Sequence, residues 1–442
     1  MRILFIILDG LGDRPVPQYQ GRTTLEAART PNLDAIAAEG VNGQLSPVAP
    51  GIAGGTPTAH ASFFGYRLDE LPGRAVFHAV ARGVDPRLDE VISLGRFASV
   101  EAGPQGLRLI ERMMTAPEEQ SAALAEAIRS YSVDSIDLTL VYTGATESVL
   151  RLAGPVSEAI TDCDPLGSEL PVIKAQPMAD APDPQAAART AEAVNQYLRW
   201  AHAVLDDHPV NRQRVDQGQL PMNFLLAKWA GRRRRLAPFG QRWGFRAASI
   251  TSEEILLGVM HELGVETMGE EREDIEQDLV ERLRTAQDLF RQGYDFVHVH
   301  TRQPDAIAHM ADPPQKVEAI EALDRGFRYL RQEILPDDDL VVVVTSDHAT
   351  PSVVSGPLKP GRFHDQHAGE PVPLVILGRN ALRDDVRAFS ERAAAQGGLG
   401  LVLGRDLMPM LLSQAERTNV IGWRPTPHDM LYRPTEVEPF EL

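Results

Sequence analysis

The stretch Leu340-Val-Val-Val-Val-Thr345, followed at once by Ser346-Asp347-His348, decides the fold of this chain. Its unbroken apolar run indicates a strand buried on both faces, because a half-exposed strand would alternate with polar residues. Strands of this kind are typical of a parallel sheet covered by helices. Three further segments have the same pattern: Ile3–Leu8, Phe296–Val299 and Val372–Leu377.

Helical patterns lie between these strands. The segment Thr24–Glu39 carries apolar residues near a 3.6-residue period, and so does Gln315–Leu330. Strands that alternate with helices predict a layered α/β domain with a mostly parallel sheet.

The middle of the chain has a different character. Breaks rich in Pro and Gly occur there, and the segments Asp137–Tyr142 and Ser148–Leu152 alternate between apolar and polar residues. We expect an inserted α+β cap over residues 70–235. The two parts of the α/β domain would then be residues 1–69 and 236–442.

Composition limits the functions that the chain can have. The 442 residues are 43% hydrophobic and 24% charged, which is typical of globular proteins. A formal net charge of -18 argues against broad binding to nucleic acid or to an anionic membrane. The one basic block, Arg232–Arg235, is interpreted as a solvated surface loop rather than a nucleic-acid patch.

Cysteine content and the N-terminus bear on the compartment. The single cysteine, Cys163, cannot form an intrachain disulfide, which fits a reducing compartment. Residues Met1–Asp9 are better explained by a buried first strand than by a signal peptide, because an acidic residue follows the apolar run directly. No apolar run approaches the ~18 residues that a transmembrane helix needs. We therefore expect a cytoplasmic protein.

Residues of metal-ligand type gather next to the expected strands. Asp9 ends the first strand, the second leads to Asp305 and His309, and the third ends in Asp347-His348. In open α/β sheets, ligands bind beyond the carboxyl ends of the strands. Carboxylate and imidazole together suit a metal such as Zn²⁺ or Mn²⁺. The segment before the fourth strand adds a pair of candidates, His364 and His367.

Each of these residues also has a structural interpretation. Asp9 before a glycine could be a turn residue, and Asp305 and His309 would share a helix face that could be mere surface. His298 and His300 face the same side of a strand, which suggests core or supporting residues. His364 and His367 compete for one position. The combined order of the set nevertheless favours a metal site.

The stretch Gly51–His60 suggests a nucleophile. Thr56 suits the N-cap of a helix and Pro57 its first position. A helix N-terminus attracts phosphate, so a hydroxyl and an anion would meet there. The alternative is a plain helix cap. Thr58 is a competing hydroxyl, but we expect it to point away from the cap. A bound metal would lower the pKa of the reacting hydroxyl.

These motifs resemble those of the archaeal-type 2,3-bisphosphoglycerate-independent phosphoglycerate mutases of the alkaline-phosphatase superfamily. The resemblance covers nearly the whole chain, and it implies an alkaline-phosphatase-like α/β domain with an inserted cap that supplies substrate contacts. The matching segments are Ile7–Pro15, Thr23–Asp34, Gly54–His60, His208–Arg214, Asp305–His309, Thr345–Pro351 and His367–Pro373.

The resemblance also implies two divalent metal ions, Mn²⁺ or Zn²⁺ first, with Co²⁺ or Mg²⁺ as alternatives. It selects His367 over His364. The ligands of one ion would be Asp9, Thr56, Asp347 and His348. Those of the other would be Asp305, His309 and His367.

This chain departs from the family at several positions. Threonine stands in place of the usual nucleophilic serine, and Thr146-Glu147 replaces a substrate-binding His-Arg. Lys228 replaces an arginine, Leu257 replaces a lysine, and Leu94–Ser99 diverges from an Arg-x-Asn motif. Lys and neutral residues cannot reproduce a bidentate arginine fork, and Glu147 would repel a carboxylate. The remaining candidate substrate contacts are Arg74, Arg96, Asn211 and Arg214.

We therefore expect an enzyme that forms a phosphothreonine on Thr56. Its substrate would be small and phosphorylated, with interconversion of 3-phosphoglycerate and 2-phosphoglycerate or of a related ester as the mutase outcome. The alternatives are a phosphatase, phosphodiesterase or phosphonate hydrolase on another substrate, and a non-catalytic metabolite-binding protein. The oligomeric state does not follow from these patterns.

Overall fold

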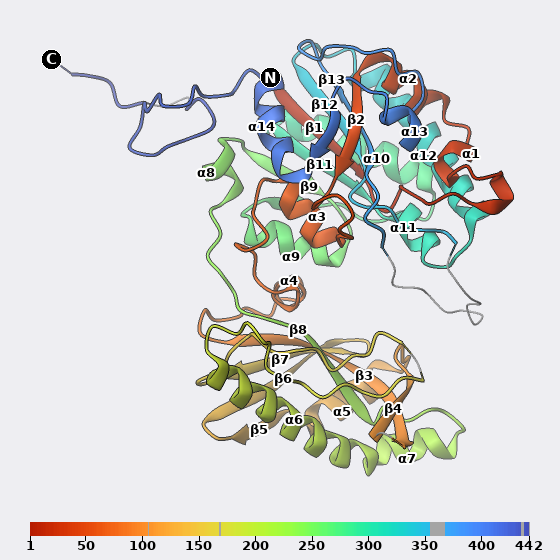
Figure 1. The fold of residues 1–442 in the computed structure, drawn as a ribbon, viewed down its shortest axis with the longest axis vertical. Helices are drawn as coiled ribbons and strands as arrows, with labels where there is room; N and C mark the ends of the chain where they lie inside the picture. The colour runs from red at the N-terminus through yellow and green to blue at the C-terminus, as the bar shows by residue number, and fades with distance from the viewer. Residues whose placement is uncertain (105, 168, 354–366, 435–436, 442) are drawn as a thin grey trace. The chain divides into compact units, whose positions relative to one another are not determined.

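The computed structural model describes residues 1–104, 106–167, 169–353, 367–434 and 437–441. The chain forms two compact units (Figure 1). Unit 1 combines Met1–Leu71 with Leu236–Leu442, and unit 2 is Pro72–Arg235.

Unit 1 is built on an eight-stranded sheet with the strand order β10-β9-β11-β1-β12-β13-β2-β14. The strands are β1 (Arg2–Leu8), β2 (Val41–Ser46), β9 (Ala247–Ile250), β10 (Glu266–Met268), β11 (Phe296–Thr301), β12 (Leu340–Thr345), β13 (Val372–Leu377) and β14 (Gly400–Leu403). The helices are α1 (Thr24–Ala27), α2 (Pro31–Glu39), α3 (Thr56–Phe63), α8 (Phe239–Trp243), α9 (Glu254–Glu262), α10 (Ile275–Arg291), α11 (Gln303–Ala308), α12 (Pro313–Tyr329), α13 (Glu391–Ala394) and α14 (Gly404–Gln414), with short turns η1 (Pro17–Tyr19) and η2 (Leu330–Ile334).

The centre of this sheet confirms the expected α/β class. Strand β1 lies between β11 and β12, and both pairings are parallel. The expectation of a parallel strand was wrong for β13, which runs antiparallel to β12 and to β2. Burial on both faces produces the apolar run, and it does so for either strand direction, so the pattern did not encode the direction.

Helices cover both faces of the sheet. On one face, Leu4, Ile6 and Leu8 of β1 belong to an apolar core with residues of α10 and α12. On the other face, the ring of Phe5 contacts Phe63 of α3, with 6.1 Å between ring centroids. None of the helices in the described part of the chain combines the length and apolar content needed to cross a bilayer.

The predicted helix Thr24–Glu39 is instead two helices, α1 and α2. Ala28 is extended, with ψ of 153°, and α2 begins at Pro31. Proline disfavours helical geometry in the residue before it, so it starts a helix and cannot continue one. The second predicted helix is confirmed as α12.

Unit 2 contains an antiparallel sheet with the order β4-β3-β7-β6-β5, and β8 pairs with β3. Helices α5 and α6 contribute to its main apolar core, whereas α4 packs on β3 and β8 in a smaller one. Its elements are α4 (Arg74–Ala81), β3 (Val91–Gly103), β4 (Gly106–Glu111), α5 (Glu118–Ala127), β5 (Ser130–Val133), β6 (Ile136–Gly144), β7 (Glu147–Ala153), α6 (Pro184–Asp206), α7 (Pro209–Asp216) and β8 (Phe224–Gly231).

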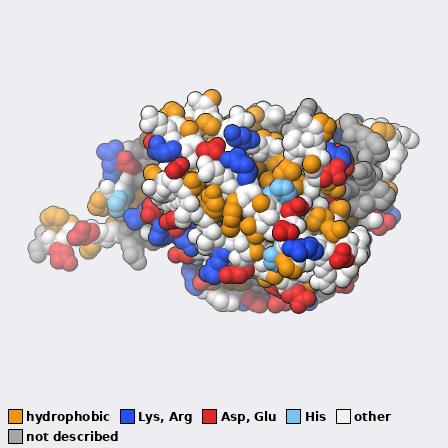
Figure 2. All heavy atoms as spheres, turned by 90° about the horizontal axis from the view of Figure 1, so that it is seen from below, with side chains coloured by type: hydrophobic (Ala, Val, Ile, Leu, Met, Phe, Trp, Pro, Cys, Tyr) orange, Lys and Arg blue, Asp and Glu red, His pale blue; other side chains and the backbone are white. Residues whose placement is uncertain are grey.

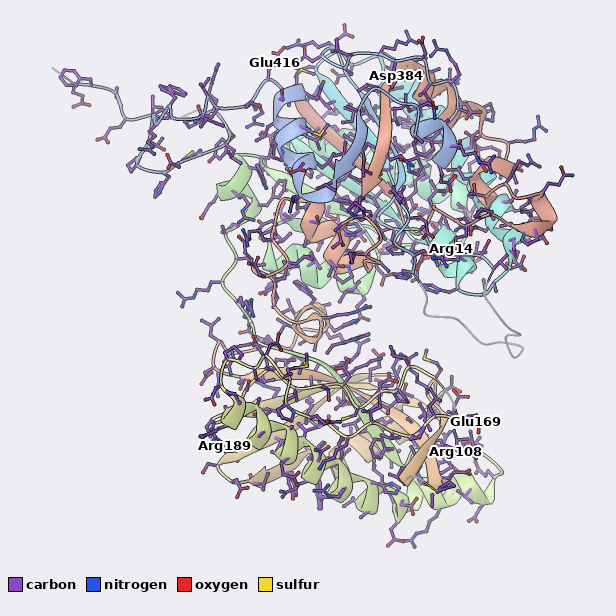
Figure 3. All side chains as sticks on the ribbon, in the orientation of Figure 1. Arg14, Arg108, Glu169, Arg189, Asp384 and Glu416 are labelled. Atoms are coloured by element: carbon purple, nitrogen blue, oxygen red, sulfur yellow. The ribbon has the colours of Figure 1, made fainter. Side chains whose placement is uncertain are left out.

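Charged side chains are spread over the surface. Basic and acidic groups are interspersed on the face shown in Figure 2. Arg108 and Glu169, labelled in Figure 3, form an exposed ion pair. Asp384, also labelled there, has a structural role because its carboxylate accepts hydrogen bonds from Asn42 of β2 and from the backbone N–H of Gly398.

A buried polar network supports the loop that follows β1. Lys316 of α12 is fully buried, and its Nζ donates to the carbonyl oxygens of Gly12 (3.0 Å) and Thr350 (2.8 Å). The same Nζ lies 3.6 Å from Asp13 Oδ2. Glu391 completes the network, since its carboxylate accepts from the Asp13 backbone N–H (3.2 Å) and from the Thr23 hydroxyl (2.8 Å).

Burial raises the pKa of Glu391 to about 7. The folded protein therefore binds this proton more tightly than the unfolded chain, where a glutamate has a pKa of ~4.3. We expect the free energy of unfolding to fall as pH rises from about 5 to 7, by up to about 3 kcal/mol. Glu391→Gln should remove this slope in urea unfolding curves across that range. Exposed Glu318→Gln is the control, and an equal slope in both variants would contradict the assignment.

Candidate metal centre

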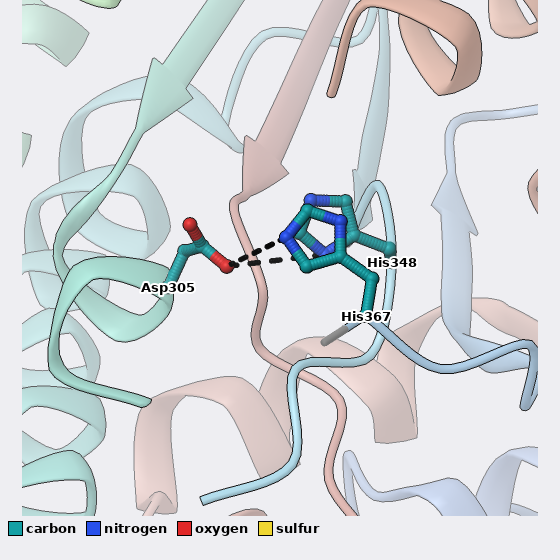
Figure 4. Close-up of side chains that lie close together, drawn as sticks. All are labelled: Asp305, His348 and His367. Carbon is teal, nitrogen blue, oxygen red and sulfur yellow. Dashed lines mark ion pairs between the residues drawn. The ribbon is translucent and has the colours of Figure 1, made fainter. Parts of the chain in front are cut away.

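The predicted ligands lie at one edge of the unit 1 sheet. Asp9 directly follows β1, Asp347 and His348 follow β12, and Asp305 lies in α11, which follows β11. Figure 4 shows Asp305 beside the stacked imidazole rings of His348 and His367, whose centroids are 3.8 Å apart. His364 lies outside the described residues.

Three oxygen atoms surround one nitrogen of His348. Its Nε2 is 3.3 Å from each of Thr56 Oγ1, Asp9 Oδ1 and Asp347 Oδ2. Both carboxylate oxygens are buried and have no hydrogen-bond partner among the described residues. Buried carboxylates are costly unless they are paired or bind a cation. One imidazole nitrogen and three oxygens fit a divalent metal ion.

A second group of donors adjoins the first. His309 Nε2 lies 3.2 Å from Asp305 Oδ2 and 3.3 Å from His367 Nε2. His367 Nε2 is 3.8 Å from Asp305 Oδ1. His309 follows α11, and its backbone N–H donates to the Asp305 carbonyl (3.0 Å), so the pair shares one helical turn as expected. These donors also suit a divalent ion.

The charges of the site favour a bound cation. Burial raises the pKa of Asp9, and the nearby Asp347 and Asp305 raise it further. Burial also raises the pKa of Asp347, to about 7. A divalent cation would offset both effects and keep both carboxylates ionised. Burial lowers the pKa of His348, which keeps the ring neutral with a lone pair available for a metal.

The helix that carries Thr56 begins one residue earlier than expected. Gly55 is the N-cap of α3 and Thr56 is its first residue. The expectation for Thr58 was wrong, because its hydroxyl returns to the cap, donating to Gly55 O (2.8 Å) and accepting from Gly55 N (3.1 Å). Thr58 therefore satisfies the cap, which leaves the Thr56 hydroxyl to face His348.

Sequence reasoning did not single out His60 and Thr350. His60 is fully buried, and its Nδ1–H donates to the Thr56 carbonyl (2.8 Å), one turn back in α3. The Thr350 hydroxyl donates to Asp305 Oδ1 (2.6 Å) and lies 3.0 Å from His348 Nδ1. The four-residue spacing between Thr56 and His60 was a usable signal for the first contact. The contact of Thr350 with Asp305 joins segments 45 residues apart, so no local spacing in the sequence indicates it.

The two strand histidines take different positions. His300 Nε2 lies 3.1 Å from Asp9 Oδ2, the oxygen that does not face His348. His298 hydrogen-bonds Ser249 through Nδ1 at 2.8 Å. His300 can therefore orient Asp9, as residues behind a metal ligand often do.

The expected substrate contacts lie in unit 2 at two places. Arg74 of α4 stacks over Trp229, with Cζ 4.1 Å from the ring centroid, and Arg96 of β3 pairs with Glu147. Asn211 and Arg214 lie on α7 and are buried. The Asn211 side-chain amide forms hydrogen bonds with main-chain atoms of Leu205 and Met222. The Arg214 guanidinium donates to the Leu220 carbonyl and to the Gln120 side chain. The substrate role of all four stays a prediction.

Comparison with known proteins gives matches over nearly the whole chain. Residues 1–414 match the family model described as the Metalloenzyme superfamily. A 2,3-bisphosphoglycerate-independent phosphoglycerate mutase of Methanopyrus kandleri is 34% identical over 95% of this chain and 98% of its own length. One from Pyrococcus furiosus is also 34% identical, with the same coverage of both chains.

Solved structures give the same result. A protein from Pyrococcus horikoshii superposes with a TM-score of 0.75 at 30% identity and covers 96% of this chain and 99% of its own. A cofactor-independent phosphoglycerate mutase from Thermoplasma acidophilum has a TM-score of 0.59 at 29% identity, and it covers 94% of this chain and 100% of its own. Full-length identity above 30% together with the matching superfamily model shows that this chain belongs to the 2,3-bisphosphoglycerate-independent phosphoglycerate mutase family of the Metalloenzyme superfamily.

Proposed function

We propose that this chain is a cytoplasmic enzyme that transfers a phosphoryl group from a small phosphate ester, of the phosphoglycerate type or related to it, to Thr56. The position of the Thr56 hydroxyl carries this proposal. It faces His348 Nε2 at 3.3 Å, beside two buried carboxylate oxygens that lack hydrogen-bond partners among the described residues. A hydroxyl that served only as a helix cap would instead turn back to the backbone, as Thr58 does.

Two divalent ions fit the donors, with Mn²⁺ or Zn²⁺ first and Co²⁺ or Mg²⁺ as alternatives. Asp9, Thr56, Asp347 and His348 would hold one ion. Asp305, His309 and His367 would hold the other. Bound there, the ions would lower the pKa of the Thr56 hydroxyl and neutralise charge on the transferring phosphoryl group.

The residues of the chain would then orient the reaction. His60 fixes the Thr56 carbonyl, and through it the start of α3. Thr350 joins Asp305 to His348, so the two donor groups keep their separation. The positive end of the α3 dipole favours an anion at Thr56. Phosphorylation of Thr56 would conserve the phosphoryl group for a second acceptor.

The second acceptor distinguishes two outcomes. The relatives are named phosphoglycerate mutases, which supports return of the phosphoryl group to the retained product. The alternative, hydrolysis of a different ester, follows from the ion pair between Glu147 and Arg96, because the Glu147 carboxylate already occupies this cation and would repel an acidic ligand bound to it. A non-catalytic metabolite-binding protein would have no use for a hydroxyl placed among metal donors.

Thr56→Ala should abolish turnover, with a loss of kcat of roughly 10³-fold or more, because the hydroxyl that accepts the phosphoryl group is removed. Thr56→Ser should keep measurable activity. The assays are conversion of 3-phosphoglycerate to 2-phosphoglycerate and release of phosphate from p-nitrophenyl phosphate, each with Mn²⁺, Zn²⁺, Co²⁺ and Mg²⁺ in turn. Thr58→Ala is the matched control and should lose about 1 kcal/mol of stability but not the chemistry. Full activity in Thr56→Ala would refute the proposal.

Lys316 should control metal affinity without binding metal. Its Nζ bonds the carbonyls of Gly12 and Thr350, so it ties the loop after Asp9 to the loop after His348. Supporting residues of this kind typically contribute 10–100-fold to metal affinity.

We therefore expect Lys316→Met to weaken metal binding by roughly 10-fold or more in a competition titration against a fluorescent chelator. Asp324→Asn is the matched control. Asp324 is a buried charge on the same helix, but it accepts hydrogen bonds from the start of α2, at Asn32 and Leu33. Equal metal affinity in folded Lys316→Met and wild type would show that Lys316 serves stability alone.

A further inference from the structure

The segment 367–369, which precedes β13, contacts two loops of the candidate metal centre. On one side its middle residue, Ala368, pairs with Ala349 of the loop after β12. The Ala368 N–H donates to the Ala349 carbonyl (2.9 Å). Because Ala349 directly follows His348, this side of the segment is fixed to a loop that carries donors for the first ion.

The other side of the segment contacts the loop that leads to Thr56. His367 Nδ1–H donates to the Gly54 carbonyl (3.1 Å), and the Gly51 N–H donates to the Gly369 carbonyl (3.1 Å). Gly54 stands two residues before Thr56, which is the first residue of α3. The segment therefore joins the loop after β12 to the loop before α3, and we call it the clip.

The contact between the clip and the loop before α3 leaves no spare room. A β-carbon on Gly369 would lie 2.4 Å from the carbonyl carbon of Gly51 and 2.8 Å from the backbone nitrogen of Ile52. These are backbone atoms of a closed turn, in which the Ile52 N–H donates to the Ala49 carbonyl (2.9 Å). A methyl group at position 369 would therefore push the turn, and with it Gly54, away from the clip.

The two ring nitrogens of His367 belong to different contacts. Nδ1 holds the Gly54 carbonyl, whereas Nε2 lies 3.3 Å from His309 Nε2 and 3.8 Å from Asp305 Oδ1 (Figure 4). With the proton on Nδ1, Nε2 keeps its lone pair for a metal ion. The orientation of this ring at the second donor group therefore also fixes the position of the loop before α3.

We propose that the clip couples the two donor groups, so that His367, once it holds a divalent ion, fixes the loop that positions Thr56. The two groups then bind metal with positive cooperativity. This inference rests on the proposed function, in which both groups hold divalent ions and Thr56 is the nucleophile. Gly369 is then a positioning residue, because it contacts the loop before α3 rather than the reacting atoms.

The sign of the coupling separates the clip from simple electrostatics. Two divalent cations in neighbouring groups repel each other, so without a link each ion would weaken the binding of the other. A link through His367 and Gly54 acts in the opposite direction, because one ion orders the loop that the other ion needs. By thermodynamic linkage the effect is the same whichever group is filled first.

Competition titrations of Mn²⁺ against a fluorescent chelator test the coupling. Wild type should bind two ions with a Hill coefficient above 1, because each ion raises the affinity for the other by roughly fivefold or more. Gly369→Ala should bind two ions with a Hill coefficient of 1 or below, because the displaced turn breaks the link. Its kcat should also fall by roughly 10-fold or more, because a misplaced nucleophile slows the chemical step.

Gly40→Ala is the matched control for crowding. A β-carbon there would lie 2.5 Å from Val375 Cγ2 and 2.8 Å from the Ile376 carbonyl oxygen, at the end of β13 that is away from the clip. This variant should lose stability as Gly369→Ala does, but it should keep the cooperative binding of wild type.

A second variant tests the coupling without crowding the clip. His309→Ala disables the second donor group and leaves the contacts of the clip in place. It should bind one Mn²⁺ at least roughly fivefold more weakly than wild type binds its second ion. Equal or tighter binding would contradict the coupling, and this comparison decides the matter if Gly369→Ala does not fold.

The inference is overturned by a wild type that binds fewer than two ions or binds them without cooperativity. Unchanged cooperativity in folded Gly369→Ala, or an equal loss in Gly40→Ala, would overturn it too. Failure of the proposed function is a separate result, because full activity in Thr56→Ala would refute the nucleophile and still leave the cooperativity of metal binding to be measured.

Discussion

Two buried carboxylate oxygens that face the same imidazole nitrogen impose the strongest constraint on this molecule. Asp9 Oδ1 and Asp347 Oδ2 lie 3.3 Å from His348 Nε2, without hydrogen-bond partners among the described residues. Like charges at this depth are tolerated when a cation compensates them. The parallel pairing of β1 with β12 brings the two acids together at one edge of the sheet. The order of the strands therefore determines which side chains meet at the candidate metal centre.

The surroundings of the acids serve to hold them in place. Lys316 joins the loops that follow β1 and β12, and His300 contacts the outer oxygen of Asp9. Glu391 and Asp13 extend the same network towards α13. A buried lysine and buried acids are unfavourable one by one, but together they satisfy each other and fix the distance between two loops. Helix α12 therefore supports the candidate site through Lys316, although none of its side chains is a predicted metal ligand.

Much of this arrangement could be predicted from the sequence, and the failures have physical causes. Apolar runs located β1, β11, β12 and β13, because burial on both faces leaves a plain pattern. The same pattern does not depend on the direction of a strand, so the expected parallel direction of β13 was wrong. Pro31 was a visible signal for the break between α1 and α2. The contact of Lys316 with Thr350 joins segments 34 residues apart, and no local spacing encodes it.

The reversed direction of β13 has a consequence for how the second group of donors is assembled. Residues that follow β11 and β12 emerge at the carboxyl edge of the sheet, and an antiparallel strand begins where its neighbours end. His367 precedes β13 and therefore lies at this edge, where its Nε2 is 3.8 Å from Asp305 Oδ1. If β13 ran parallel to β12, its first residue would lie at the opposite edge of the sheet. The six residues of the strand would then separate that residue from the carboxyl edge by roughly 20 Å. The antiparallel direction of β13 thus lets His367, which precedes its strand, join Asp305 and His309, which follow β11.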